Sequence, residues 1–170
     1  MTIGAVEAIL VAVVLAILRF VTLVSRPRVE VLGRVEGLRG LHSIDHHAGA
    51  RTVPGVLLLR FNGPIVFFNA SYFKQQVLAA VAAASPGLRW VVVDMIPVTM
   101  VDVTGIHATR DLGAALAESG IGLAAAGRQT EWEQWFARRG LERSGAPHTF
   151  PSLSAAIEAC RQDTETARGE

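Results

Sequence analysis

The run Asp102-Val103-Thr104-Gly105 holds the residues best placed to do chemistry, because it opens a predicted helix. The free amides at the start of a helix carry partial positive charge and can hold an anion or a phosphate group. Asp102 brings a negative charge to the same point, and the sequence has no glycine-rich Walker run for a nucleotide. Thr104 is predicted to be the N-cap of the helix. The run is therefore interpreted as a regulatory or ligand-binding loop, with nucleotide as an alternative ligand.

Asp94 is the second acidic candidate, because it ends a predicted strand across a loop from Asp102. Two neighbouring carboxylates could form a general acid–base pair, which would need a pocket and a shifted pKa. The competing interpretation is that Asp94 accepts hydrogen bonds from loop amides, and it is favoured. Asp94 is thus a candidate partner of the loop, and no catalytic residue is predicted.

Histidines gather only at His42, His46 and His47, beside Asp45. An H-x3-H spacing could bind a metal on a helix, but glycines flank this stretch and favour a solvated loop. The single cysteine, Cys160, cannot build a disulfide framework or a metal quartet. We therefore predict no metal and no cofactor. The net charge of +1 also excludes a nucleic-acid footprint spread over the whole chain.

The segment from Ile3 to Val24 is apolar except for Gly4, Glu7, Arg19 and Thr22. As a helix it would span roughly 33 Å, about the thickness of a bilayer core. Its start carries no positive charge, which argues against a secretory signal, and arginines follow at 26, 28, 34 and 39. This pattern predicts a single transmembrane helix, with the chain after it in the cytoplasm.

Glu7 is an acid inside or beside that predicted membrane helix. An intramembrane carboxylate is a functional candidate, because burying its charge in lipid is costly. Its place a turn or two from the N-terminus favours the membrane interface, and contact with a partner helix is the alternative.

Helical and strand patterns alternate in the rest of the chain and predict an α/β domain with a mixed sheet flanked by helices. A hairpin of strands 56–61 and 65–68 would make the sheet mixed. Asn69 is predicted to cap a helix. The predicted strands are 29–32, 56–61, 65–68, 88–95, 121–126 and 149–150, and the predicted helices are 70–84, 104–119, 130–139 and 152–161.

Several segments in this order resemble the end of SulP-family (sulfate permease) transporters, in which a last membrane helix leads into a STAS domain. They are SRPRVEVLGRVEG, PGVLLLRFNGPIVFFNASYF, WVVVDMIPVTMVDVTG and PSLSAAIEA. The resemblance extends from about residue 3 to residue 160. It implies residues 1–25 as the transmembrane helix, 26–54 as a basic juxtamembrane connector, 55–162 as the STAS domain and 163–170 as a disordered tail.

The resemblance implies a non-enzymatic regulatory and assembly module at the inner (plasma) membrane, with its STAS domain cytoplasmic. The expected partners are the lipid bilayer, the remaining transmembrane domain of an anion transporter and a protein at the STAS surface, with a homodimer as a further expectation. One helix cannot conduct an anion, so the chain is expected to be a fragment or a split subunit. The alternatives are a free-standing switch of the anti-sigma-factor antagonist type and a nucleotide sensor. In those antagonists a serine after the loop aspartate is phosphorylated, but this position holds Val103.

Overall fold

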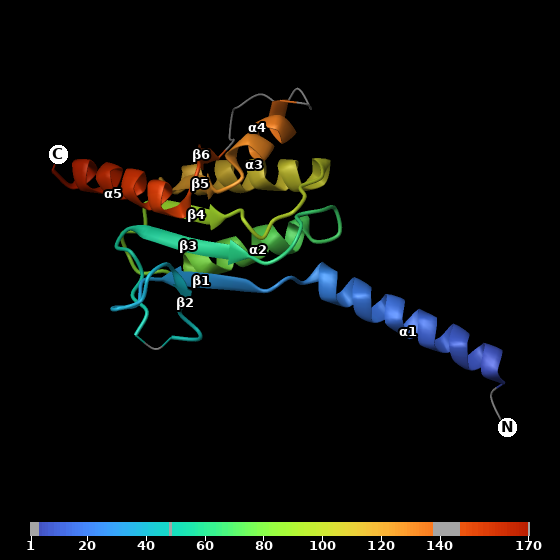
Figure 1. Cartoon of the computed structure of the whole chain (residues 1–170). Helices are drawn as coiled ribbons and strands as arrows, with labels where there is room; N and C mark the ends of the chain where they lie inside the picture. Colours follow the sequence, from blue (N-terminus) through green and yellow to red (C-terminus); the bar gives the residue numbers. More distant parts are fainter. Residues whose placement is uncertain (1–3, 48, 138–146, 170) are drawn as a thin grey trace.

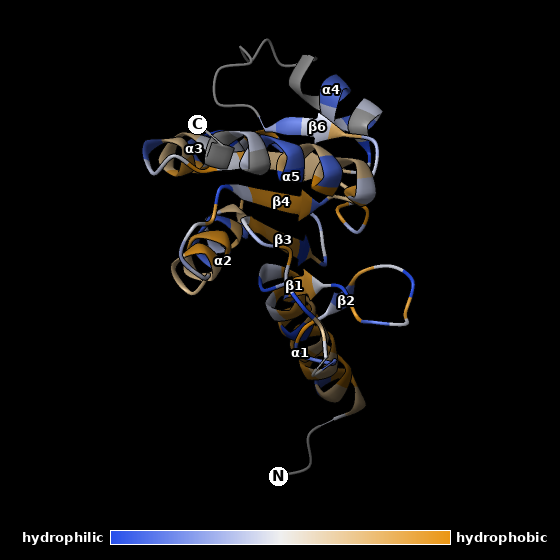
Figure 2. Cartoon of the chain, turned by 90° about the vertical axis from the view of Figure 1, so that its left-hand side faces the viewer, coloured by the Kyte–Doolittle hydropathy of each residue, from blue (hydrophilic) through white to orange (hydrophobic). Residues whose placement is uncertain are grey.

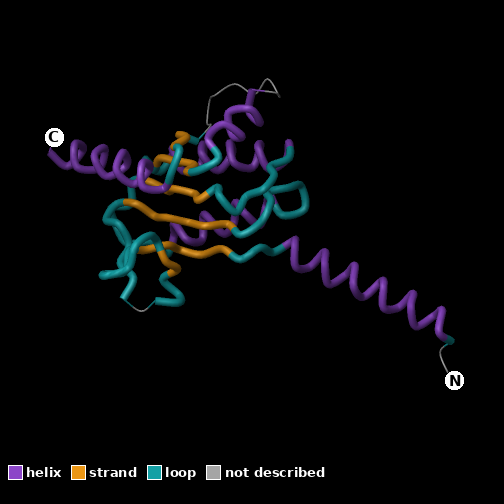
Figure 3. Tube along the Cα trace, viewed as in Figure 1, coloured by secondary structure: helices purple, strands orange, loops and turns teal. Residues whose placement is uncertain are grey.

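The computed structural model describes residues 4–47, 49–137 and 147–169 (Figure 1). The elements alternate along most of the chain, as Figure 3 shows. In chain order they are α1 (Ala5–Ser25), β1 (Val29–Gly33), β2 (His42–Ser43), β3 (Val56–Phe61), α2 (Ala70–Ala82), β4 (Trp90–Asp94), α3 (Val103–Glu118), β5 (Gly122–Ala126), α4 (Gln129–Ala137), β6 (His148–Phe150) and α5 (Leu153–Gly169).

Within the described residues, one sheet contains six strands in the order β2-β1-β3-β4-β5-β6. Strands β3 to β6 are parallel, whereas β1 runs antiparallel to both β2 and β3. The predicted mixed sheet in an α/β domain is therefore confirmed. Strands β1 and β2 lie in the segment interpreted as a connector, so part of residues 26–54 belongs to the sheet.

The predicted hairpin partner Ile65–Phe68 is wrong, because these residues form no strand. Ile65 makes only an isolated parallel bridge to Val101. Its amide donates to the Met100 carbonyl at 2.9 Å, and its carbonyl accepts from the Asp102 amide at 3.2 Å. The backbone of Ile65 is thus bonded to the loop after β4, and β1 takes the antiparallel place beside β3.

Two hydrophobic cores cover the two faces of the sheet. Alternate strand residues point to opposite faces, so a strand buried on both sides reads as a continuous apolar run. The larger core joins the strands to α2, α3 and α4, and its buried residues include Leu59, Val93, Phe73, Leu112 and Trp132. The smaller core joins the other face to α5 and includes Leu58, Val92, Ile157 and Cys160. This two-sided burial explains the apolar runs of β3 and β4.

Helix α5 extends through the expected disordered tail, since residues 163–169 are helical. Side-chain contacts in this last part explain the difference. Asp163 accepts a 2.8 Å hydrogen bond from Trp90 Nε1. Thr164 is buried and donates to the Cys160 carbonyl. The tail prediction failed because the polar composition did not reveal the bond from Trp90 of β4 to Asp163 or the burial of Thr164.

Helix α1 projects away from the sheet and has no buried residue (Figures 1 and 2). In the part of the chain that the structure describes, it alone is long and apolar enough to cross a membrane. Residues 5–23 of this apolar helix are exposed, so no protein core buries their side chains. Residues 1–3 of the predicted membrane segment lie outside the described residues.

Candidate functional site

Three segments meet at the edge of the sheet where the parallel strands β3 and β4 end. Antiparallel pairing places Val29, the first residue of β1, opposite Phe61, the last residue of β3. The end of α1 therefore lies at the same edge as the loops that follow β3 and β4 (Figure 1). Ligand sites of parallel sheets commonly lie at this edge.

Asp102 joins two of these segments through its carboxylate. Its Oδ1 accepts a 2.8 Å hydrogen bond from the Gly105 amide, and its Oδ2 accepts one of 2.8 Å from the Phe67 amide. The first bond caps α3, and the second fixes the loop after β3. The carboxylate also places a negative charge at the helix start, where it is stabilised by the partial positive charge of the helix. An incoming phosphate would have to compete with this built-in anion.

Thr104 does not cap α3, so that prediction is wrong. The residue at the N-cap is Asp102, which has an extended backbone (φ −87°, ψ −178°), and α3 begins at Val103. A capping side chain bonds an amide two or three residues later, and Asp102 reaches Gly105 in this way. Val103 and Thr104 lie exposed in the first turn.

Gly105 lies where α3 packs directly on the backbone of the loop after β3. A Cβ at this position would overlap the Ile65 carbonyl oxygen and would lie 2.9 Å from Val101 Cγ1. The absence of a side chain thus permits the close approach that lets Asp102 bond to Phe67.

Asp94 and Asp102 are bound by different partners. Asp94 is 1% exposed; its Oδ2 accepts from Arg60 Nε at 2.8 Å, and its Oδ1 accepts from the Ile96 amide at 3.0 Å. No hydrogen bond between the two carboxylates occurs in the described structure. The geometry offers an ion pair and a loop amide for Asp94 and no acid–base pair.

Asn69 has a role at this site that the sequence did not reveal. It stands at the N-cap of α2 but makes no side-chain cap, so the predicted capping role is wrong. Instead its Oδ1 accepts from the Val66 amide at 2.8 Å, while its Nδ2 donates to the carbonyls of Pro64 at 2.9 Å and Val24 at 3.1 Å. Val24 belongs to the last turn of α1, so a buried side chain connects the apolar helix to the domain. Local sequence carries no signal for this bond, because Val24 lies 45 positions away.

Exposed apolar side chains surround this junction, and we call them the apolar rim. They come from the loops after β3 and β4 and from the start of α3. The rim consists of Phe67, Phe68, Ile96, Met100 and Val103, which are 45–69% exposed.

The family of the chain follows from a comparison with known domains. Residues 47–156 match the STAS domain model. The chain belongs to the STAS domain family. A Mycobacterium tuberculosis protein named a probable sulfate transporter is 33% identical over 160 residues, which are 94% of this chain and 29% of that protein. The chain therefore spans less than a third of the length of this relative.

Two solved structures show the same fold as this STAS protein. A murine anion transporter, Solute Carrier 26 family member A9 in the inward-facing state, aligns with a TM-score of 0.79 at 21% identity, over 91% of this chain and 25% of that one. The STAS domain of a SulP transporter from Vibrio cholerae aligns with a TM-score of 0.51 at 18% identity, over 72% of this chain and 94% of that one. The murine likeness thus extends beyond the part that matches the STAS model.

The remaining candidates of this STAS protein are Glu7 and the histidine cluster. Glu7 is in the first turn of α1, at the end farther from the sheet. His42 and His47 form an edge-to-face ring contact with centroids 5.0 Å apart, and His46 Nε2 lies 3.9 Å from Glu30 Oε1. Among the described residues, no group of three or more His, Cys, Asp and Glu could hold a metal ion.

Proposed function

We propose that this chain is a membrane-anchored regulatory and assembly module of a SulP-type inorganic anion transporter. The observation that most directly supports this proposal is the hydrogen bond of Asn69, which joins the end of an apolar helix to the STAS domain. A helix suited to a bilayer and a folded regulatory domain are thereby joined by a buried contact as well as by the chain itself.

The proposed location is the inner membrane, with α1 as a single span and the STAS domain in the cytoplasm. The charge pattern supports this orientation, because Arg26 and Arg28 directly follow α1. A single helix cannot surround an anion pathway, so a transmembrane domain in the same or another chain would supply it. The sulfate transporter name of the tuberculosis relative supports a sulfate-like anion.

In the proposed regulatory role, a movement of the membrane helix is transmitted to the STAS domain by hydrogen bonds and packing contacts, without catalysis. Movement of α1 would act on Asn69 through the Val24 carbonyl. Asn69 holds Val66, and the next residue, Phe67, is bonded to Asp102 at the start of α3. The apolar rim surrounds this path, and we assign it to contact with the transmembrane domain. The segment from Asp102 to Gly105 would then report the state of the membrane helix.

The two alternative functions have less support. A phosphorylated switch would need a hydroxyl at the position of Val103. A nucleotide sensor would need the start of α3 to accept a phosphate, but the Asp102 carboxylate already lies there. Titration of the full chain in detergent micelles with GTP, ATP and sulfate distinguishes a nucleotide sensor from the proposed module. Amide NMR shifts of Val103 and Thr104 that saturate with nucleotide would favour the sensor.

Topology is the first test of the proposed module. Alkaline phosphatase or green fluorescent protein is fused after residue 170 of the full chain in a bacterial host. We expect a carbonate-resistant membrane protein that is fluorescent and has no phosphatase activity, because the domain stays in the cytoplasm. Recovery in the soluble fraction, or an active phosphatase fusion, would overturn membrane anchoring with this orientation.

Crosslinking tests the assignment of the apolar rim. A photoreactive amino acid replaces Phe67 in the rim or, as a control, Arg89, which is exposed before β4 at the opposite sheet edge. The chain is expressed in place of the matching segment of the tuberculosis relative. We expect crosslinks to the transmembrane part from position 67 only. Equal crosslinking from both positions would contradict the assignment.

A further inference from the structure

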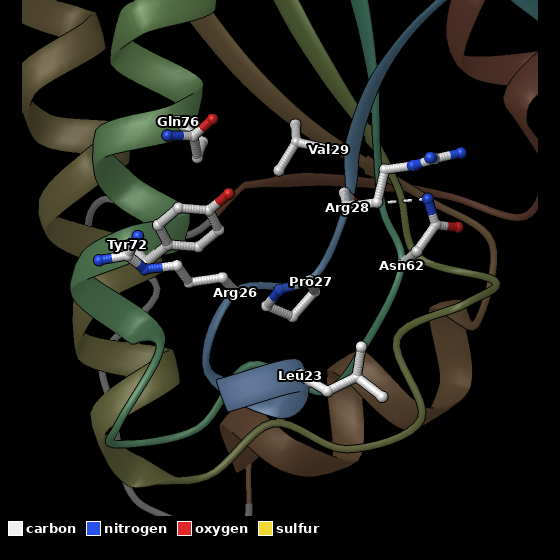
Figure 4. A pocket seen from close by; sticks show the side chains of 8 residues that line it. All are labelled: Leu23, Arg26, Pro27, Arg28, Val29, Asn62, Tyr72 and Gln76. Atoms are coloured by element: carbon white, nitrogen blue, oxygen red, sulfur yellow. Dashed lines mark hydrogen bonds between the residues drawn. The ribbon is translucent and has the colours of Figure 1, made fainter. Parts of the chain in front are cut away.

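A pocket of about 580 Å³ lies beside the end of α1 (Figure 4). Three parts of the chain line it: the last turn of α1 and the strap 26–29, the turn after β3, and one face of α2. Their side chains include Leu23 from α1, Asn62 from the turn, and Tyr72 and Gln76 from α2. Tyr72 and Gln76 are four residues apart, so they project from the same side of α2. The pocket thus joins the apolar helix to the STAS domain.

The charged residues that line this pocket are both basic. Arg26 and Arg28 line it, and Arg26 makes no ion pair or hydrogen bond with the described residues. Residues 8–29 contain three arginines and no acid, and α2 contains Lys74 and no acid. An uncompensated guanidinium above a polar pocket attracts an anion, and it can form two parallel hydrogen bonds to a phosphate.

Glu30 is the carboxylate near the pocket, and its oxygens already have partners. Its Oε2 accepts a 2.8 Å hydrogen bond from Asn62 Nδ2, and its Oε1 lies 3.9 Å from His46 Nε2. Arg28 Nη1 lies 3.4 Å from the same histidine nitrogen. In Figure 4 the Arg26 side chain extends along Tyr72, whereas Arg28 turns toward the Asn62 side. The Arg26 side of the pocket therefore keeps its positive charge available.

The position and the apolar wall favour one kind of anion. The pocket begins at Leu23 in α1, whose apolar residues end at the strap, where a bilayer would give way to water. Leu23, Pro27 and Val29 give one wall an apolar character. A phospholipid presents a phosphate beside an apolar glycerol ester and acyl chain, which matches this combination of groups.

We propose that this pocket binds the phosphate of an anionic phospholipid, through the Arg26 guanidinium with Tyr72 and Gln76 as further hydrogen-bonding groups. Arg28, which also lines the pocket, supplies a second positive charge. A bound headgroup would hold the strap between α1 and α2 and so fix the helix relative to the domain. This inference rests on the proposed membrane anchoring.

Lipid binding by the full chain tests the proposal. Native mass spectrometry from detergent micelles measures the binding of phosphatidylglycerol against phosphatidylcholine. We expect a preference for phosphatidylglycerol that falls about tenfold or more in Arg26→Gln, because a charge-assisted hydrogen bond is lost. Tyr72→Phe should weaken binding several-fold. Arg89→Gln is the matched control, since it removes the same charge from an exposed site at the opposite sheet edge.

Two further comparisons distinguish a lipid site from a free-anion site and from diffuse charge attraction. Inorganic phosphate and sulfate are added as competitors, and full displacement of the lipid by either at millimolar concentration would identify a free-anion site and overturn the lipid assignment. An equal loss in Arg26→Gln and Arg89→Gln would show diffuse attraction and would also overturn it. If the chain inserts into membranes but shows no lipid preference, this pocket assignment fails while the anchoring stands. If the chain does not insert into membranes, the proposed membrane anchoring is wrong, and the lipid site that rests on it is wrong too.

Discussion

The side-chain amide of Asn69 donates a 3.1 Å hydrogen bond to the backbone carbonyl of Val24, in the last turn of α1. Carbonyls in the last turn of a helix have no partner within the helix, so another group must satisfy them. Here the partner is a fully buried side chain of the STAS domain. The end of the apolar helix is thereby fixed by the fold of the domain.

Asn69→Ala should destabilise the domain and loosen α1 together. The change removes three hydrogen bonds and leaves the buried Val66 amide without a partner, at a cost of about 1–3 kcal/mol, and the partly buried Pro64 carbonyl loses its bond as well. Denaturant unfolding of the full chain in micelles measures the loss. Hydrogen exchange should quicken both in residues 64–70 and in the last turn of α1.

Asn62→Ala is the control for that experiment, because Asn62 is exposed and bonds to Arg28 and Glu30 at the surface. It should cost less stability and leave exchange in α1 unchanged. If both variants behaved alike, the buried contact at Val24 would have no special role.

Asp102→Ala should destabilise the domain more than Thr104→Ala. Asp102 caps α3 and also holds the Phe67 amide, and loss of an N-cap alone costs about 0.5–2 kcal/mol. Thr104 lies exposed inside the first turn, so its loss should be close to neutral. Thermal unfolding of the two variants decides the point. A larger loss in Thr104→Ala would return the capping role to the threonine.

Gly105→Ala should also be destabilising, although alanine is the better helix former. The new Cβ would overlap the Ile65 carbonyl, and relief of such overpacking costs about 1–3 kcal/mol. Gly49→Ala is the matched control, because a Cβ at Gly49 meets nothing within 4 Å. Chemical denaturation compares the two. Equal stability of both variants would contradict the close approach of α3 to the loop.

Much of the fold could be predicted from local patterns. The run Trp90–Val93 indicated a strand buried on both faces, and two cores enclose it. The start of α3 was placed within one residue, because Asp, Thr and Gly are typical of helix starts. Such elements depend mainly on residues close in sequence, and their propensities agree with the final structure.

The contacts that build the candidate site could not be predicted, because they join residues far apart in sequence. The bond from Asn69 to Val24 spans 45 positions, and the one from Phe67 to Asp102 spans 35. Ile65–Phe68 looked like a strand by composition, yet the backbone of Ile65 is bonded to the loop after β4. Tertiary pairing of this kind overrides local β-propensity.

Cys160 should resist alkylation in the folded protein. It lies on the buried face of α5 and is 2% exposed, and burial raises the pKa of its thiol from an ordinary 9.0 to about 11, with the Asp163 carboxylate adding to the rise. The thiolate is the reactive form, so both access and ionisation oppose the reaction. We expect slow maleimide labelling at pH 8 that becomes fast in denaturant, whereas Ser154→Cys in a Cys160→Ala background should label quickly, since Ser154 is exposed.

The same raised pKa predicts how stability depends on pH. A thiol whose pKa is higher in the folded state favours folding while it stays protonated. Its contribution is therefore complete below about pH 9 and is lost as the pH rises toward 11. Unfolding midpoints measured across this range should fall more steeply for the parent chain than for Cys160→Ala. Parallel curves would mean that the thiol ionises as readily in the folded chain as in the unfolded one.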